Sequence, residues 1–200
     1  MPPPPDVSLL TRYVFENPWP LGMGLMLVAA WAMWTGLRQG IKRRQQTAGV
    51  LALISIAVFS AAFLVQTSGE HAKAVVRGLV AAVVDGDPSA DGFFASRAVI
   101  AFGSPKNPGH GLEMIEQGLA RVASQYPIES NSTTMLRGYT QSGDVGIVHL
   151  ACWTTVRGGY GPTPSQWVLR VERQLDQSWL ITHITCVSIN NQTPSSDRIW

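Results

Sequence analysis

Two long runs without a charged side chain occupy the first third of the chain. The first covers residues 19–37, and the second covers residues 48–65 with the sequence AGVLALISIAVFSAAFLV. A helix rises about 1.5 Å per residue, so about 20 apolar residues cross a hydrocarbon core about 30 Å thick. Lipid offers no partner to free backbone groups, so a run of this length spans a membrane as a helix. The pattern therefore predicts a hairpin of two transmembrane helices, with the lipid bilayer as its partner.

The short segment between the runs, residues 38–46, predicts how the hairpin is oriented. Its four positive charges, with no negative charge among them, come from Arg38, Lys42, Arg43 and Arg44. Loops rich in Lys and Arg stay on the cytoplasmic side of a membrane. We therefore expect this loop in the cytoplasm, and both the N-terminus and the chain after about residue 66 outside it. Neither run contains a charged residue or a histidine, so we interpret the hairpin as an anchor.

The hydrophobic period changes after residue 69. Apolar side chains then recur three and four residues apart, as on one face of a helix, and segments rich in Gly and Pro separate the elements. The pattern predicts a helix over 70–84, a turn over 85–89, a short helix over 89–96, a strand over 98–102, a loop over 103–111 and an amphipathic helix over 112–125.

After residue 127 the period shortens to the alternation of strands. The predicted strands cover 133–140, 145–156, 166–175 and 179–189. Helices followed by an antiparallel meander are typical of an α+β fold. About 135 residues follow the hairpin, which is enough for one domain with its own core.

Charge and cysteine content narrow the function classes. Residues 66–200 hold ten Lys and Arg against eleven Asp and Glu without a basic cluster, so we expect no nucleic-acid partner. Cys152 and Cys186 fall on strands that the strand over 166–175 separates, which places them about 9.5 Å apart. A disulfide tolerates a Cα separation of about 7 Å, so both thiols are expected to be free. The four histidines lack metal-site spacing and no cofactor motif is present, so we expect neither metal nor cofactor.

Two histidines are candidate functional residues because they fall on apolar faces of strands. By alternation, His149 shares a face with Trp153, and His183 shares a face with Ile181. The two rings are therefore predicted to look into one concavity. A histidine on such a face is also found as a hydrogen-bonded core residue, and this alternative stays open.

Three short segments carry a resemblance to a known family. They are Asp85-Gly86-Asp87 after the first helix of the domain, Gly111-Leu112-Glu113-Met114-Ile115 at the start of a later helix, and Trp179-Leu180-Ile181-Thr182-His183 in the last strand. Together with the order of elements, they resemble the nuclear transport factor 2 (NTF2) superfamily, in particular its SnoaL-like branch. The expected layout is a Pro-rich tail (1–18), a transmembrane hairpin (19–66), an NTF2-like cone (70–189) and a C-terminal tail (190–200).

The resemblance implies a pocket between the helices and the concave face of a curved sheet. Some members of the family use it to isomerise, cyclise or dehydrate small apolar molecules, and many members only bind or oligomerise. Here Ser96-Arg97-Ala98 stands where many members carry acidic residues. The candidates for a general base are His149, His183 and Asp91, with Tyr139 or Trp153 as the donor to an oxyanion. The expected pocket wall consists of Tyr139, Trp153, Trp167 and His183.

The favoured interpretation is a non-catalytic module. It is an anchored domain outside the cytoplasm that binds a small apolar ligand or a protein partner, as a homodimer through its sheet. The alternative is an isomerase or dehydratase that acts on a small lipid-like substrate from the bilayer, and a structural subunit of a membrane assembly is the third. The fold alone does not choose among these functions.

Overall fold

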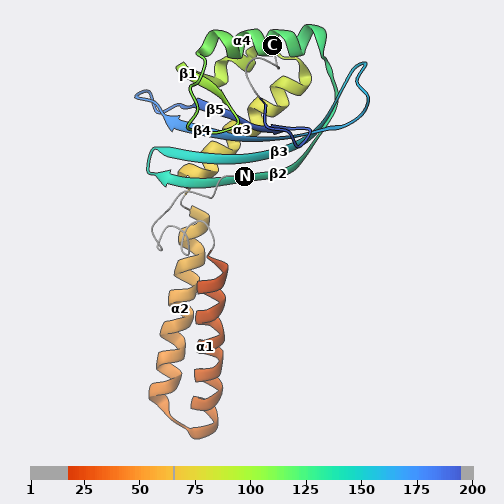
Figure 1. Cartoon of the computed structure of the whole chain (residues 1–200). Coiled ribbons are helices and arrows are strands. Elements are labelled where there is room, and N and C mark those ends of the chain that lie inside the picture. Colours follow the sequence, from red (N-terminus) through yellow and green to blue (C-terminus); the bar gives the residue numbers. More distant parts are fainter. Residues whose placement is uncertain (1–17, 65, 195–200) are drawn as a thin grey trace. The chain divides into compact units, whose positions relative to one another are not determined.

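The structure of the chain is a computed structural model that describes residues 18–64 and 66–194 (Figure 1). These residues form two compact units, which divide in the sequence between residues 67 and 68. Most of the predicted tail over 1–18 lies outside the described residues. The same holds for the end of the second predicted span, at residue 65, and for residues 195–200 of the predicted C-terminal tail.

The first unit is a helical hairpin of α1 (Trp19–Gln39) and α2 (Lys42–Leu64). Gly40 ends α1 in the left-handed conformation, with φ of 65°, which glycine adopts without a steric penalty. The N–H of Ile41 then donates to the Gly36 carbonyl at 3.0 Å. The predicted nine-residue loop over 38–46 is therefore wrong, because the connection is only two residues long. Lys and Arg are good helix formers, so the basic residues extend both helices instead.

Small residues form the contact between the two helices. The buried positions are Gly22, Ala29 and Gly36 in α1 and Ala48 and Ser55 in α2. A Cβ atom on Gly22 would lie 2.5 Å from the ring of Phe59, so the helices approach as closely as glycine allows. The hydroxyl of Ser55 donates to the Gly22 carbonyl across this contact at 2.8 Å.

Most of the large apolar side chains of the hairpin are exposed. Trp31 of α1 is 64% exposed, and Leu27 of α1 and Leu53 of α2 are each 68% exposed. Among the residues whose side chains are described, α1 is the one helix long and apolar enough to cross a membrane, with a mean hydropathy of 1.4. A signal sequence or the core helix of a soluble protein meets the same criteria. The described part of α2 does not meet them, so one of the two predicted spans is supported in this way.

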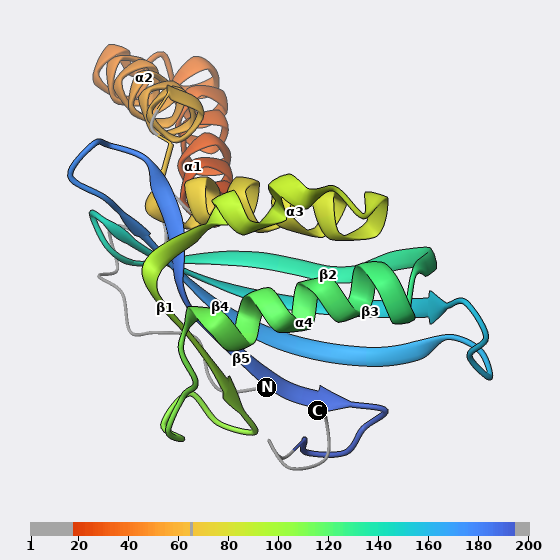
Figure 2. The same cartoon turned by 90° about the horizontal axis from the view of Figure 1, so that it is seen from above.

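The second unit has an α+β fold, as predicted. Its elements are α3 (Ser68–Asp85), the 3₁₀-helix η2 (Pro88–Phe93), β1 (Phe94–Phe102), α4 (Leu112–Gln125), β2 (Ile128–Ser142), β3 (Val145–Val156), β4 (Thr163–Arg173) and β5 (Trp179–Ile189). The strands form one sheet in the order β1-β5-β4-β3-β2. Figure 2 shows α3 and α4 over one face of this sheet. We call the opposite face the outer face.

The sheet is mixed, whereas the sequence predicted an antiparallel one. Strands β2 to β5 form the predicted antiparallel meander, but β1 pairs in parallel with β5 at the edge. The chain reaches this arrangement because α4 separates β1 from β2, which lie at opposite edges of the sheet. Alternation along a strand predicts which face of the sheet each side chain occupies. It does not predict whether an edge strand pairs in parallel or antiparallel with its neighbour.

The core of the domain fills the space between the helices and the sheet. The apolar stripe of α3 packs on the inner side chains of the strands, and Ile181 and Val148 are fully buried there. The start of α3 lies directly on the backbone of β2, since a Cβ on Gly138 would fall 2.0 Å from the carbonyl oxygen of Gly69. Burying one such aliphatic side chain contributes about 1.5–3 kcal/mol, so this cluster supplies the main driving force for the fold.

Both cysteines are buried and free, as predicted. Cys152 lies on β3 and Cys186 on β5, with β4 between them. Burial raises the pKa of the Cys186 thiol to about 12. Neither sulfur is therefore a reactive group in the folded domain.

Candidate functional site

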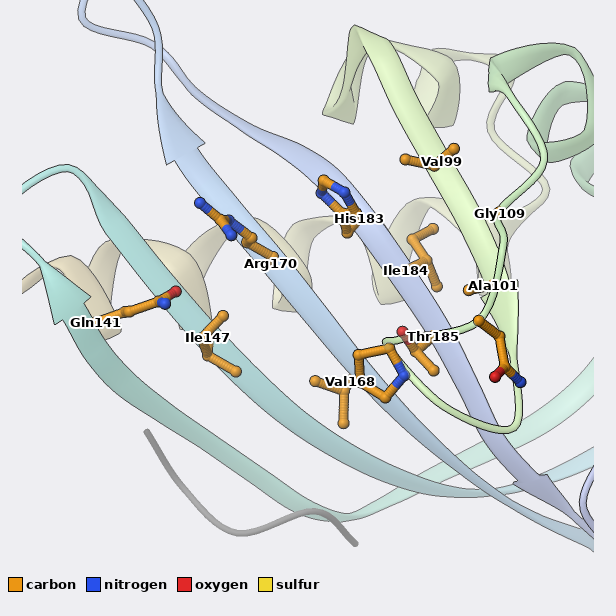
Figure 3. A pocket seen from close by; sticks show the side chains of 12 residues that line it. Val99, Ala101, Gly109, Gln141, Ile147, Val168, Arg170, His183, Ile184 and Thr185 are labelled. Carbon is orange, nitrogen blue, oxygen red and sulfur yellow. The ribbon is translucent and has the colours of Figure 1, made fainter. Parts of the chain in front are cut away.

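A lateral row of side chains crosses the outer face of the sheet. The strand register pairs Tyr139 with Ile147, Ile147 with Arg170, and Arg170 with His183, and β1 adds Val99 beside His183. The row therefore draws one residue from each of the five strands. Figure 3 shows Val99, Ile147, Arg170 and His183 on the same side of the sheet, with helices behind it.

A bulge in β5 decides the direction of His183. Val171 pairs with Ile181 and Arg170 pairs with His183, so Thr182 is an extra residue in β5. Ile181 is in the core and His183 is exposed. The predicted shared face of His183 and Ile181 is therefore wrong, because strict alternation across residues 179–189 takes no account of a bulge.

A cavity of about 360 Å³, here called the outer cavity, lies over this row. Among the described residues, its polar lining includes Asn107, Gln141, Arg170, His183 and Thr185, and its apolar lining includes Val99, Ala101, Ile147, Val168 and Ile184. The floor is thus mainly aliphatic, and polar groups stand at intervals around it (Figure 3).

The loop over 103–111 forms one wall of the outer cavity. The backbones of Ile100 and His110 exchange two hydrogen bonds of 2.8 Å, which fold the loop back along β1. The amide of Asn107 donates to the Phe102 carbonyl at 2.6 Å. These bonds hold Gly109 against Val99, where a Cβ would lie 3.0 Å from the valine side chain. The wall is therefore tied to the strand that it borders.

Two arginines and one glutamate set the charge beside the cavity. Glu172 accepts a hydrogen bond from Arg97 at 2.5 Å, and its other carboxylate oxygen lies 2.7 Å from Nε of Arg170. The N–H of that nitrogen does not point at the carboxylate, so within the described residues Nε of Arg170 has no hydrogen-bond partner. The ring of His183 is partly buried against the sheet, and the pKa of His183 is lowered first by this partial burial and then by the charge of Arg170, so the ring is mainly neutral at neutral pH.

The other predicted site residues are distributed over both faces of the sheet. His149 is buried on the outer face, where its ring meets Tyr139 edge-on at 5.0 Å, and burial lowers its pKa. Trp153 is 48% exposed on the same face. Trp167 packs against the core on the inner face, with its indole N–H donating to Ser165 at 2.9 Å. Of the predicted pocket residues, only His183 lines the outer cavity.

Asp91 lies in a different part of the domain. It lines a second cavity of about 220 Å³ between the end of α3, η2 and α4, together with Asp87 and Glu116. Asp87 is the N-cap of η2 and accepts a hydrogen bond from the Ser89 N–H at 2.8 Å, which lowers the pKa of its carboxyl group. No group of three His, Cys, Asp or Glu residues suited to a metal ion occurs in the described part of the chain.

Neither cavity lies in the pocket position that the family resemblance implied. The space between the helices and the sheet holds the core cluster, and Trp167 and Trp179 pack against it. The ring of Trp179 also stacks on His71 at 5.1 Å. Sequence reasoning missed Arg170, Gln141 and Asn107 as lining residues. For a polar residue on a solvent-facing strand position or in a loop, the sequence does not indicate which residues lie beside it in the fold.

Comparison with known proteins gives partial matches of shape. No family model and no curated protein matches the chain. A protein from Shewanella frigidimarina, provisionally named a ketosteroid isomerase, is 15% identical over 60% of this chain and 94% of its own, with a TM-score of 0.48. A domain of unknown function with a cystatin-like fold from Nostoc punctiforme is 13% identical over 67% of this chain and 83% of its own, with a TM-score of 0.47.

An NTF2-like protein from Cytophaga hutchinsonii is 8% identical over 57% of this chain and 92% of its own, with a TM-score of 0.46. Similarity of this degree assigns neither a family nor an activity to the chain. Any functional conclusion therefore rests on the residues of the chain itself.

Proposed function

We propose that the chain is a membrane-anchored binding module with an NTF2-like domain outside the cytoplasm, which takes a small ligand on the outer face of its sheet. The observation that carries the proposal is the outer cavity, because it joins an aliphatic floor to a few placed polar groups. This combination is typical of small-molecule sites, whose volumes start at about 300 Å³.

Inverted packing supports a two-pass anchor. A hairpin in water buries large apolar side chains and exposes polar ones, whereas helices in lipid meet through small residues. Here Gly22 and Ser55 lie in the contact, while Trp31 and Leu53 are exposed. An exposed apolar surface of this extent on a water-soluble protein would drive aggregation, and lipid would cover it.

The charges at the turn support the proposed orientation. Lys42, Arg43 and Arg44 occupy the first turn of α2, where the helix dipole disfavours positive charge. Arg38 lies in the last turn of α1, with its guanidinium carbon 4.5 Å from the ring centre of Trp34. The positive charges in the first turn lower the stability of α2. Their presence is explained if they keep the turn in the cytoplasm.

Cysteine labelling tests anchor and orientation together. Cysteines are introduced at Gln46, near the turn, and at Ser124, on the exposed surface of α4, in a background with Cys152 and Cys186 replaced by Ala. A membrane-impermeant maleimide is expected to label position 124 in intact cells and position 46 only after lysis. Labelling of both positions in intact cells, or release of the protein from membranes by carbonate, would contradict the proposal.

Native mass spectrometry of the full chain, ejected from lipid nanodiscs, tests ligand binding. A co-purified small molecule is expected, and Val168→Trp should remove it by filling the outer cavity. Leu175→Trp is the matched control, because Leu175 is fully exposed after β4. A ligand retained in the Val168 variant would place its site elsewhere.

An isomerase or dehydratase is the second candidate, and one observation favours it. His183 lines the outer cavity as a neutral imidazole, which is the form a general base requires. Glu172, the carboxylate whose charge acts on His183, already binds Arg97. Turnover of a ligand identified by mass spectrometry, abolished by His183→Gln, would establish the enzyme over the binding module.

A further inference from the structure

We infer that the outer cavity binds a small amphipathic anion, with its negative group on the guanidinium of Arg170 and its apolar body on the aliphatic floor. This inference rests on the proposed binding function and specifies the chemical class of the ligand.

The first step of the argument is the balance of charge. Arg97 and Arg170 stand on either side of Glu172, and both lie within 2.7 Å of its carboxylate. Two guanidinium groups and one carboxylate leave one positive charge beside the cavity. No Asp or Glu is among the described residues that line the cavity itself. Binding of one monovalent anion in the cavity would therefore neutralise this remaining positive charge.

The second step concerns the hydrogen-bonding capacity of Arg170. A guanidinium offers five N–H donors, and within the described residues the buried Nε of Arg170 makes no hydrogen bond, while the side chain as a whole is 39% exposed. Glu172 lies close to Nε but out of line with its N–H. A buried donor without an acceptor is costly, and a carboxylate is the acceptor that matches the planar fork of arginine.

The third step is the floor. Val99, Ile147 and Val168 come from three different strands and lie around Arg170 and His183 (Figure 3). Apolar area placed on this floor leaves water at about 25 cal/mol per Å². The neutral His183 adds no repulsion to an apolar group. A cavity of about 360 Å³ suits a small amphiphile with a single chain or ring.

A matched ligand series tests the inference in the full chain held in lipid nanodiscs. Octanoate, 1-octanol and octylammonium share one apolar body and differ in the charge of the head group. In calorimetric titrations with empty nanodiscs as the blank, octanoate is expected to bind about 10-fold more tightly than octanol. Octylammonium should bind most weakly. Equal affinities for octanoate and octanol, or no binding of any probe, would overturn the inference, whereas the binding function fails only if no ligand co-purifies with the chain.

Three variants identify the residue responsible. Arg170→Gln should abolish the preference for octanoate. Arg173→Gln is the matched control, since it removes the same charge from the same strand and its side chain faces Asp144 at 3.6 Å. Gln141→Glu is an exposed substitution at the cavity, and it should weaken octanoate and strengthen octylammonium without affecting the fold. An unchanged preference in both cavity variants would overturn the assignment to this cavity.

Chain length separates the two sources of such an anion. A soluble short acid and a fatty acid released from lipid share a carboxylate and an apolar body. If hexadecanoate binds no more tightly than octanoate, as the volume of the cavity leads us to expect, the ligand is a soluble short acid. A continuing gain in affinity with chain length supports the same anion site and identifies lipid as its source.

Discussion

Between the two helices of the hairpin, the buried residues are glycine, alanine and serine, and the large apolar side chains are exposed. Between the helices and the sheet of the α+β domain, the buried residues are mostly valine, leucine, isoleucine and phenylalanine, with some alanine and both cysteines. The two units use the same types of residue in opposite places. The domain is stabilised by removing apolar surface from water, whereas the hairpin depends on close backbone approach and on one buried hydrogen bond.

The largest difference is expected when a large apolar side chain is truncated in each unit. Ile181→Ala in the domain should lower the free energy of unfolding by about 2–5 kcal/mol, because Ile181 is fully buried in the core. Leu53→Ala in the hairpin should change stability by less than about 0.5 kcal/mol, because Leu53 is 68% exposed. Alkylation of Cys186 along a urea titration measures unfolding of the domain, and the distance between spin labels on α1 and α2 measures separation of the hairpin. A similar loss in both variants would contradict the comparison.

A smaller effect is expected in the hairpin when one of its small buried residues is replaced by a larger one. Gly22→Val should destabilise the helix pair by about 1–3 kcal/mol, because the new side chain meets the ring of Phe59. Gly24→Val is the matched control, since nothing lies within 4 Å of its added Cβ. Spin labels on the two helices should report a wider separation for the first variant alone. Equal separations in both variants would mean that the close approach is not required.

Removal of the hydroxyl of Ser55 should have a modest effect on the hairpin. Ser55→Ala loses the hydrogen bond to the Gly22 carbonyl, and such bonds between membrane helices contribute about 0.6 kcal/mol on average. Ser60→Ala on the exposed side of α2 is the control. Spin-label distances across a temperature series should separate the two variants. A loss well above about 1.7 kcal/mol would indicate that Ser55 does more than donate this bond.

Acid is expected to produce the smallest effect, and only in the domain. The pKa values of His149 and His183 are both lowered by burial, so the unfolded chain takes up protons first as the pH falls below about 6.5. Their contribution to stability is present above this pH and is lost as the pH falls toward the lowered pKa values. Urea midpoints at pH 7.5 and 5.0 should show the loss, and His149→Gln should reduce it. The described part of the hairpin has no histidine or carboxylate, so its spin-label distances should not change.

Periodicity predicted most of the elements. The helix over 112–125 and the strand over 179–189 have the observed bounds, and the strand over 145–156 does too. Local pattern determines these elements, since each presents a continuous apolar face. The predicted strand over 98–102 is shorter than β1, because the edge strand already begins at Phe94, where the sequence predicted a helix.

The candidate site was less predictable for a physical reason. The direction of His183 depends on one unpaired residue in β5, and a bulge is a property of two strands in register. Arg170 could not be predicted as a site residue because its role depends on Glu172 and Arg97, and Arg97 lies two strands away in the sheet. Pairings of this kind are not encoded in any single stretch of sequence.

Thr182, the unpaired residue beside His183, lets β5 tolerate the deletion of one residue at this position. Ile181 faces the core and His183 faces outward on either side of Thr182, so loss of the Thr182 codon would leave an unbroken alternation in which both keep their faces. Loss of the codon for Ile184 would instead exchange the faces of Thr185 and Cys186, which lie before Val187, the second extra residue of β5. Insertions and deletions across homologous genes are thus expected to gather at Thr182 and to avoid its neighbours.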